Sequence, residues 1–129
     1  MNIGIDLDTT LIKLPCIEIA SQELGYDFNE EDNKDWHFSV FPDNLRQRVF
    51  QMFSDPFIMC EKVTPLEGSQ NKIKEWVDDG HNIILITARV EPIRKGTVSM
   101  VERYYPDIRD INFVGFNESK SSLMVSKKL

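Results

Sequence analysis

The chain has 129 residues, of which 41% are hydrophobic and 28% are charged, and its formal net charge is -6. This length suits one compact domain, and the composition excludes a disordered tail or a fibre. The acidic balance also argues against a nucleic acid polymer as a partner, because affinity for the phosphate backbone comes from clustered Lys and Arg.

Cysteine usage and the N-terminus indicate where the protein works. The two cysteines, Cys16 and Cys60, have no zinc-type spacing and do not make a disulfide framework, so we expect a reducing compartment. The N-terminus has no basic segment followed by a long apolar stretch, so we expect no signal peptide. A cytoplasmic location without membrane attachment is the simplest interpretation.

A short buried strand is predicted over Asn2–Leu7, built on Ile3 and Ile5. Two carboxylates, Asp6 and Asp8, flank the leucine at its end. The carboxyl end of a strand is thus predicted to carry a doublet of negative charge.

Helical patterns without a convincing strand fill the stretch from Leu14 to Thr64. The first pattern consists of Ile17, Ala20 and Leu24 and ends at Gly25, and the second consists of Leu45, Val49, Met52 and Phe53, behind Asp43. We expect residues 14–64 to be a small helical cap, inserted into a core domain formed by residues 1–13 and 65–129.

An aromatic-rich loop, "DWHFSVFP", joins the helical patterns of the cap. Trp36, His37, Phe38 and Phe41 have two possible uses, either as a pocket wall that stacks on a nucleobase or as the cap's own small core. We favour the second use.

The core domain continues with alternating helices and strands. Ser69 is predicted to cap a helix with Ile73, Trp76 and Val77 on one stripe, and Gly80 is predicted to take the left-handed position that ends it. The unbroken aliphatic run over Ile83–Ile86 is typical of a parallel strand covered on both faces.

A second helix is predicted between Pro92, in its first turn, and Pro106, which stops it. Its buried face consists of Ile93, Thr97, Met100, Val101 and Tyr104. A weaker strand over Ile111–Phe116 and a helix over Ser119–Lys128 follow. The alternation predicts an α/β fold with a mainly parallel sheet and helices on both of its faces.

The candidate site follows from the ends of these strands. In an open parallel sheet the ligand crevice lies beyond the carboxyl ends of the strands, where Asp6, Asp8, Thr87 and Arg89 fall. Two carboxylates this close repel each other, and Mg²⁺ bound through one or two carboxylates, water and a phosphate meets the need for a cation. A plain turn whose carboxylates cap backbone groups is the simpler alternative. For Arg89, contact with a substrate and an ion pair with the acidic cluster both remain open.

Three short segments resemble the signatures of the haloacid dehalogenase superfamily of phosphatases. "DLDTTL" resembles the first signature, Asp-x-Asp-x-Thr, while "ILIT", which ends at Thr87, resembles the second and "NESKSS" offers Lys120 for the third. The segments "ITARVEPIRKGTVSMVERYYPDIRDINFVGFNESKSSL" and "DPFIMCEKVTPLEGS" are similar to the 5′(3′)-deoxyribonucleotidase family and its bacterial and phage relatives, which share an early helical cap.

The resemblance implies a Mg²⁺-dependent phosphomonoesterase that acts on a small, nucleotide-like phosphate ester. Asp6 would attack phosphorus to form an aspartyl-phosphate, and Asp8 would protonate the leaving oxygen and then deprotonate a water. Mg²⁺ would bind the Asp6 carboxylate and the Asp8 main-chain carbonyl. The substrate-binding residues would be Thr87, Ala88, Arg89 and Lys120.

Two positions depart from the pattern of the superfamily. Thr9 stands where glycine is often found, and the fourth signature, an acidic pair after a further strand, would follow Leu129. We therefore expect a core that lacks the last strand or strands of its sheet and an open edge through which copies of the chain associate. The alternative function is a catalytically inactive module that binds phosphate or a nucleotide, or an interaction protein. A two-component receiver domain is disfavoured, because its phosphorylated Asp ends a third strand and the helical cap occupies that region here.

Overall fold

Three parallel strands form the main sheet, in the order β1 (Asn2–Ile5), β4 (Asn82–Thr87) and β5 (Asp110–Phe113). The computed structural model describes residues 1–35 and 37–115. In the register of the sheet, Leu85 of the central strand lies between Ile5 of β1 and Ile111 of β5. The predicted α/β class is confirmed, and each of the three predicted strands overlaps an observed one.

Two helices, α3 (Ser69–Asp78) and α4 (Arg94–Tyr104), pack on the face of the sheet that carries Ile83 and Leu85. The strands follow one another in one direction across the sheet, and right-handed crossovers then place both helices on the same side. The opposite face carries a small cluster of Ile84, Ile86 and Val114. The sequence predicted helices on both faces, but the helices that the structure describes beside this sheet lie on one face. The helix predicted over 119–128 lies outside the described residues.

The ends of α3 and α4 test the capping signals read from the sequence. Gly80 takes a φ of +89° just after α3, as predicted, and a turn containing Pro92 leads into α4. The predicted Ser69 cap is wrong: Gly68 occupies the N-cap position, and the Ser69 hydroxyl lies 2.8 Å from the Tyr105 hydroxyl instead. A tertiary partner has taken the side chain that a local rule assigned to the helix end.

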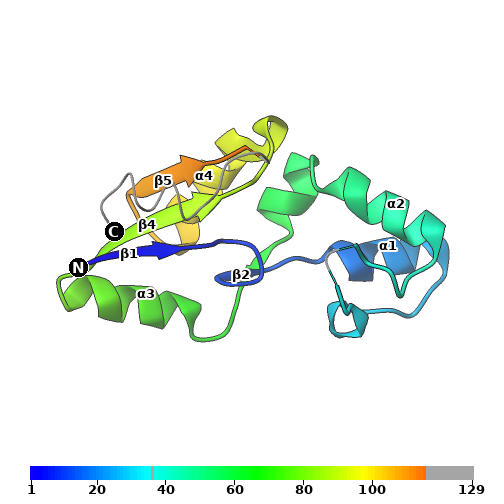
Figure 1. Cartoon of the computed structure of the whole chain (residues 1–129), viewed down its shortest axis with the longest axis horizontal. Coiled ribbons are helices and arrows are strands. Elements are labelled where there is room, and N and C mark those ends of the chain that lie inside the picture. The colour runs from blue at the N-terminus through cyan, green and yellow to red at the C-terminus, as the bar shows by residue number, and fades with distance from the viewer. Residues whose placement is uncertain (36, 116–129) are drawn as a thin grey trace.

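The segment predicted as a cap, residues 14–64, contains two α-helices that pack against each other, α1 (Cys16–Leu24) and α2 (Asp43–Met52). We refer to this segment as the cap and to the rest of the chain as the core domain. Shorter turns, η1 (Glu30–Asp32) and η2 (Phe57–Glu61), precede and follow α2. Figure 1 shows α1 and α2 side by side and set apart from the main sheet. Gly25 ends α1 with a φ of +80°, as the sequence predicted.

The cap has a hydrophobic cluster separate from the one beneath the sheet. Its buried members are Cys16, Ile17, Ala20, Phe41, Leu45, Val49, Met52, Ile58, Met59, Cys60 and Ile93. Ile93 lies just before α4, so the core domain also contributes to this cluster. The cap therefore has a hydrophobic core of its own.

The chain leaves and re-enters the core domain along a small two-stranded ribbon. Strand β2 (Ile12–Lys13) pairs antiparallel with β3 (Thr64–Pro65), and the Leu66 N–H donates to the Leu11 carbonyl at 2.8 Å. The sequence predicts neither strand, because two residues are too few to show an alternating pattern. The ribbon thus holds the two connections between the core domain and the cap side by side, next to the end of β1 (Figure 1).

None of the helices within residues 1–35 and 37–115 has the length and the apolar run that a membrane crossing needs.

Candidate active site

A tight turn after β1 directs the two predicted catalytic carboxylates to one side. Leu7 is fully buried in the core, and its carbonyl accepts the Leu11 N–H at 2.9 Å. Successive side chains of an extended chain point in opposite directions, so Asp6 and Asp8 turn away from the core that takes Leu7. Thr9 follows with a φ of +63°, which closes the turn in the conformation that glycine adopts most easily.

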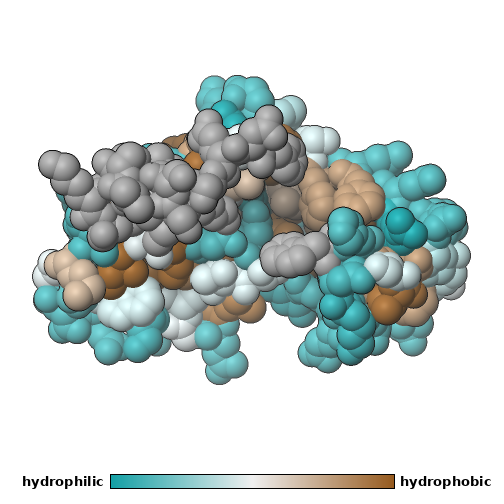
Figure 2. All heavy atoms as spheres, viewed as in Figure 1, coloured by the Kyte–Doolittle hydropathy of each residue, from teal (hydrophilic) through white to brown (hydrophobic). Residues whose placement is uncertain are grey.

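Both carboxylates line a pocket of about 330 Å³ between the sheet and the cap. The core domain contributes Asp6, Asp8, Thr9, Ala88, Arg89, Val90 and Ile93, and the cap contributes Leu14, Cys16, Ile17, Glu30, Asn33, Phe38, Val49, Phe53 and Met59. Figure 2 shows hydrophobic atoms inside the hollow between the two parts of the molecule. The carboxylates thus lie at one end of a mostly apolar pocket.

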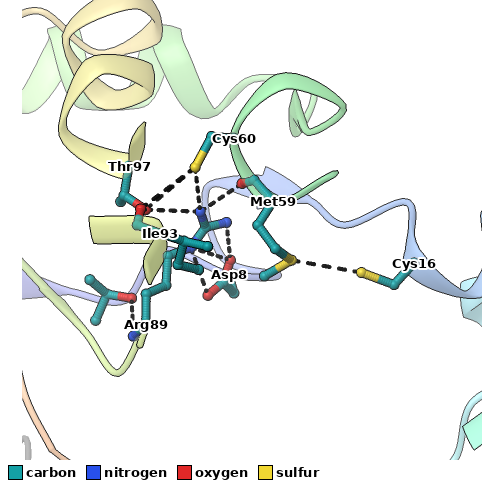
Figure 3. A network of polar contacts seen from close by, with 8 residues as sticks. Asp8, Cys16, Met59, Cys60, Arg89, Ile93 and Thr97 are labelled. Atoms are coloured by element: carbon teal, nitrogen blue, oxygen red, sulfur yellow. Dashed lines mark hydrogen bonds and ion pairs between the residues drawn. The ribbon is translucent and has the colours of Figure 1, made fainter. Parts of the chain in front are cut away.

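Arg89 forms an ion pair with Asp8 at the edge of this pocket (Figure 3). Its Nη2 lies 2.8 Å from Asp8 Oδ1, and its Nε lies 3.2 Å from Oδ1 and 3.3 Å from Oδ2. The Arg89 side chain is 1% exposed and that of Asp8 is 28% exposed. The geometry is therefore that of the second role considered for Arg89, an ion pair with the acidic cluster.

The other predicted substrate-binding residues have different positions. Ala88 lines the pocket, whereas Thr87 is fully buried and is not one of the described residues that line it. The Thr87 hydroxyl accepts the Arg89 N–H at 3.3 Å, so it supports the loop that carries the arginine. Lys120 lies outside the described residues.

Phe38 and Phe41 both belong to the hydrophobic core of the cap, the use favoured for them, and Phe38 also lines the pocket. Phe38 lines the pocket together with Phe53, and their ring centroids are 6.0 Å apart. Phe41 is buried in the cap cluster, and His37 is exposed. Trp36 lies outside the described residues. The pocket therefore has an aromatic wall on the side of the cap.

Burial raises the pKa of two further titratable groups in the pocket. The pKa of the Cys16 thiol rises to about 12 because the group is buried and faces the negative charge of Asp8. The pKa of Glu30 is also raised, first by burial and then by the nearby Glu18. A thiol with this pKa stays protonated at neutral pH and is a poor nucleophile there.

Oxygen donors at the end of β1 suit a hard cation such as Mg²⁺, which takes one or two carboxylates and fills its remaining positions with water and phosphate oxygens. The Asp6 carboxylate and the Asp8 main-chain carbonyl fit this donor set. Within the part of the chain that the structure describes, no three His, Cys, Asp or Glu side chains gather into a group that could hold a metal ion.

Sequence reasoning missed two contributors to the site. The Met59 carbonyl and the Thr97 hydroxyl both accept hydrogen bonds from Arg89. No sequence pattern marks a backbone carbonyl as an acceptor, and Thr97 had been assigned only to the buried face of its helix. Comparison with known proteins adds no family assignment, since no family model and no curated protein matches the chain.

Proposed function

We propose that the chain is a Mg²⁺-dependent phosphomonoesterase of the haloacid dehalogenase type that hydrolyses a small phosphate ester. The observation that carries the proposal is the shared orientation of Asp6 and Asp8, which both line one pocket beyond the carboxyl end of a parallel strand. A turn in which a carboxylate only caps backbone groups requires one aspartate, whereas two line the same pocket here.

In the proposed reaction, a carboxylate oxygen of Asp6 attacks phosphorus, and the bond from phosphorus to the ester oxygen breaks. Asp8 gives a proton to the departing oxygen, which leaves as an alcohol. Asp8 then takes a proton from a water molecule, and the water oxygen attacks the aspartyl-phosphate to release inorganic phosphate and restore Asp6. Mg²⁺ bound at Asp6 and Asp8 would supply positive charge to the phosphoryl oxygens.

The pocket also supports a substrate class. Its volume of about 330 Å³ lies at the small end of the usual range for ligand sites, and most of its wall is apolar. The aromatic rings of Phe38 and Phe53 suit a flat or apolar leaving group, such as the base of a nucleotide. A small nucleotide-like ester therefore fits better than a phosphorylated protein.

Release of inorganic phosphate from an aryl phosphate tests the proposal. We expect turnover with Mg²⁺ present, loss of turnover with a chelator, and a loss of about 10³-fold or more in Asp6→Asn. Asp107→Asn is the matched control, because Asp107 is exposed and belongs to the segment before β5. Equal rates for wild type and Asp6→Asn would remove the nucleophile from the proposal.

A catalytically silent module that binds phosphate or a nucleotide is the second candidate. The feature that favours it is the ion pair, because Arg89 contacts both carboxylate oxygens of the residue that must transfer the proton. A folded wild-type chain that binds an aryl phosphate without releasing phosphate would support this candidate and exclude the hydrolase.

A further inference from the structure

Arg89 is the most extensively bonded buried side chain near the pocket, and its bonds run to three separate segments (Figure 3). Besides the ion pair with Asp8, its Nη1 lies 2.6 Å from the Met59 carbonyl oxygen and 3.0 Å from Thr97 Oγ1. Asp8 belongs to the turn after β1, Met59 to η2 and Thr97 to α4. One guanidinium thus joins the proposed acid–base residue, the segment by which the chain returns from the cap, and a helix of the core domain.

The bonds around Arg89 have a fixed direction. The Thr97 hydroxyl donates its proton to the Ile93 carbonyl at 2.6 Å, so toward Arg89 it acts as an acceptor. The carbonyl of Met59 and the carboxylate of Asp8 are acceptors by nature, and a guanidinium carries only donors. Arginine also offers these donors in a planar fork, which lets it contact acceptors on two sides at once, whereas a lysine ammonium is a single point charge.

Burial assigns these donors to the protein rather than to a ligand. The Arg89 side chain is 1% exposed, and Nε, Nη1 and Nη2 all have protein acceptors within 3.3 Å. A phosphate that took these donors would have to displace Asp8 or Met59. The burial of Arg89 and its bonds to protein acceptors therefore disfavour direct contact with the phosphate.

We propose that Arg89 is a positioning residue that couples the orientation of Asp8 to the docking of η2 against the core domain. While the Met59 carbonyl holds one side of the guanidinium, the other side holds the Asp8 carboxylate toward the pocket. When η2 moves away, the guanidinium loses that anchor and Asp8 loses its fixed orientation. The acid–base function of Asp8 in this inference rests on the proposed phosphatase activity, but the mechanical coupling does not.

Steady-state kinetics of Arg89→Lys test the positioning role. The lysine keeps the positive charge but reaches one acceptor segment and not both, so we expect kcat to fall about 10- to 100-fold while KM stays within about threefold. A rise in KM at unchanged kcat would identify Arg89 as a substrate contact and overturn the inference, and so would unchanged values of both.

Arg103→Gln is the matched control for this variant. Arg103 Nη2 lies 3.8 Å from Glu61 Oε2, so this pair also joins α4 to η2, but its side chains are about half exposed. Exposed pairs contribute little, and we expect kcat within about twofold of wild type. An effect of Arg103→Gln equal to that of Arg89→Lys would show that any loosening of η2 suffices, and it would overturn the specific role of Arg89.

Amide hydrogen exchange tests the coupling without any substrate. In Arg89→Lys we expect exchange to accelerate about fivefold or more both in residues 57–61 and in residues 7–12, because the two segments share one anchor. Acceleration in one segment alone would overturn the coupling. Coupling is reciprocal, so Asp8→Asn must accelerate exchange in residues 57–61 as well, and an unchanged rate there would also overturn it.

The two measurements separate failure of the inference from failure of the proposed function. If the folded wild-type chain hydrolyses no phosphate ester, the proposed function fails and hydrogen exchange alone decides the coupling. If wild type turns over substrate but the exchange rates of the two segments do not change together, the function stands and the coupling fails. Should Arg89→Lys not fold, the exchange of residues 57–61 in Asp8→Asn gives the decision.

Discussion

Thr9 illustrates, at the scale of single residues, how strongly the site constrains its backbone. A φ of +63° is unfavourable for a β-branched residue, and Thr9 is exposed, so its side chain gains little from packing. The turn keeps this conformation because the Thr9 N–H donates to the Ile12 carbonyl at 2.9 Å. The hydrogen bond of the turn, rather than the intrinsic backbone preference of threonine, therefore sets the conformation of Thr9.

Replacing Thr9 by glycine should therefore stabilise the chain. Relief of about 1–2 kcal/mol of left-handed strain exceeds the roughly 0.5–1 kcal/mol that a glycine costs in backbone entropy, so we expect the free energy of unfolding to rise by about 0.5–1 kcal/mol in urea titrations. Thr10→Gly is the control, since Thr10 is also exposed but has no positive φ, and it should lose about 0.5–1 kcal/mol. Equal losses in both variants would mean that the turn carries no strain at Thr9.

The buried thiol of Cys16 gives a prediction for the pH dependence of stability. The unfolded chain releases this proton near the ordinary pKa of 9.0, whereas the folded chain keeps it up to a pKa of about 12. The stabilisation is thus fully present below pH 9 and is lost as the pH rises toward 12. Above about pH 9 we expect the free energy of unfolding to fall less steeply with pH in Cys16→Ala than in wild type. The two slopes should differ by up to about 1.4 kcal/mol per pH unit. Parallel curves for the two proteins would contradict the raised pKa.

Sequence reasoning could place Asp6 and Asp8 on one side of a strand end, because they are neighbours in the chain and the alternation of an extended segment fixes their relation. It could not decide between the two roles of Arg89. Asp8 lies 81 positions away along the chain, and the choice depends on which acceptor the fold brings within reach. Contacts between distant segments have no local signal of this kind.

At the scale of elements, the same division appears at the helix ends. The glycines after α1 and α3, Gly25 and Gly80, were predictable because a left-handed residue at a helix end depends on the local backbone alone. The role of Ser69 was not predictable, because its hydroxyl contacts Tyr105, which follows α4 and is distant in the sequence. The two-residue strands β2 and β3 were not either, since their pairing joins segments on the two sides of the cap.

The contact between α4 and η2 gives a prediction about helix packing. A Cβ built on Gly96 would lie 2.8 Å from Cys60 Sγ and 3.3 Å from its Cβ, and Cys60 is buried. In an open helix position Gly→Ala gains about 1 kcal/mol, but here overpacking costs about 1–3 kcal/mol, so we expect Gly96→Ala to lower the free energy of unfolding by about 1–2 kcal/mol.

Two variants check this interpretation of the contact. Ser99→Ala places the same methyl group at an exposed position of α4 and should be neutral or slightly stabilising. Gly96→Ala should cost less in a Cys60→Ala background, where the sulfur is absent, and this difference is measured as the coupling free energy of a double-mutant cycle. A coupling energy near zero would show that the sulfur is not the obstacle.

At the scale of the whole molecule, the described residues form two large hydrophobic clusters and a small one on the opposite face of the sheet. One large cluster lies between the sheet and its two helices and the other lies inside the cap. Residues of the cap cluster line the pocket, with Asp6 and Asp8 at the side of the sheet. Composition and periodicity could predict that the cap is helical. They could not predict how it docks, because docking depends on Arg89, on the β2–β3 ribbon and on the buried hydroxyl of Tyr105.

Tyr105 links the end of α4 to two segments that flank the β2–β3 ribbon, one just before β2 and the other at the start of α3. The Tyr105 hydroxyl donates to the Leu11 carbonyl at 2.5 Å, just before β2, and lies 2.8 Å from the Ser69 hydroxyl at the start of α3. The residue is 1% exposed, and burial raises the pKa of its phenol, so the donated proton is retained. The bond therefore ties the end of α4 to the base of the ribbon that carries the cap.

Removing this hydroxyl should destabilise the whole chain rather than one helix. We expect Tyr105→Phe to lower the free energy of unfolding by about 1–3 kcal/mol, because the Ser69 hydroxyl is left buried without its partner and the Leu11 carbonyl keeps only the Leu66 N–H. Tyr104→Phe serves as the control at the neighbouring position, since Tyr104 is only half-buried, and it should change stability by less than about 0.5 kcal/mol. Ser69→Ala should restore part of the loss in the Tyr105→Phe background, because replacing both partners removes the unsatisfied group.

Two measurements on Tyr105→Phe locate the effect. A single cooperative unfolding transition in urea, together with an equal loss of hydrogen-exchange protection in the cap and the core domain, would place it at the ribbon. Loss of protection in α3 alone would instead make the bond a local feature of that helix.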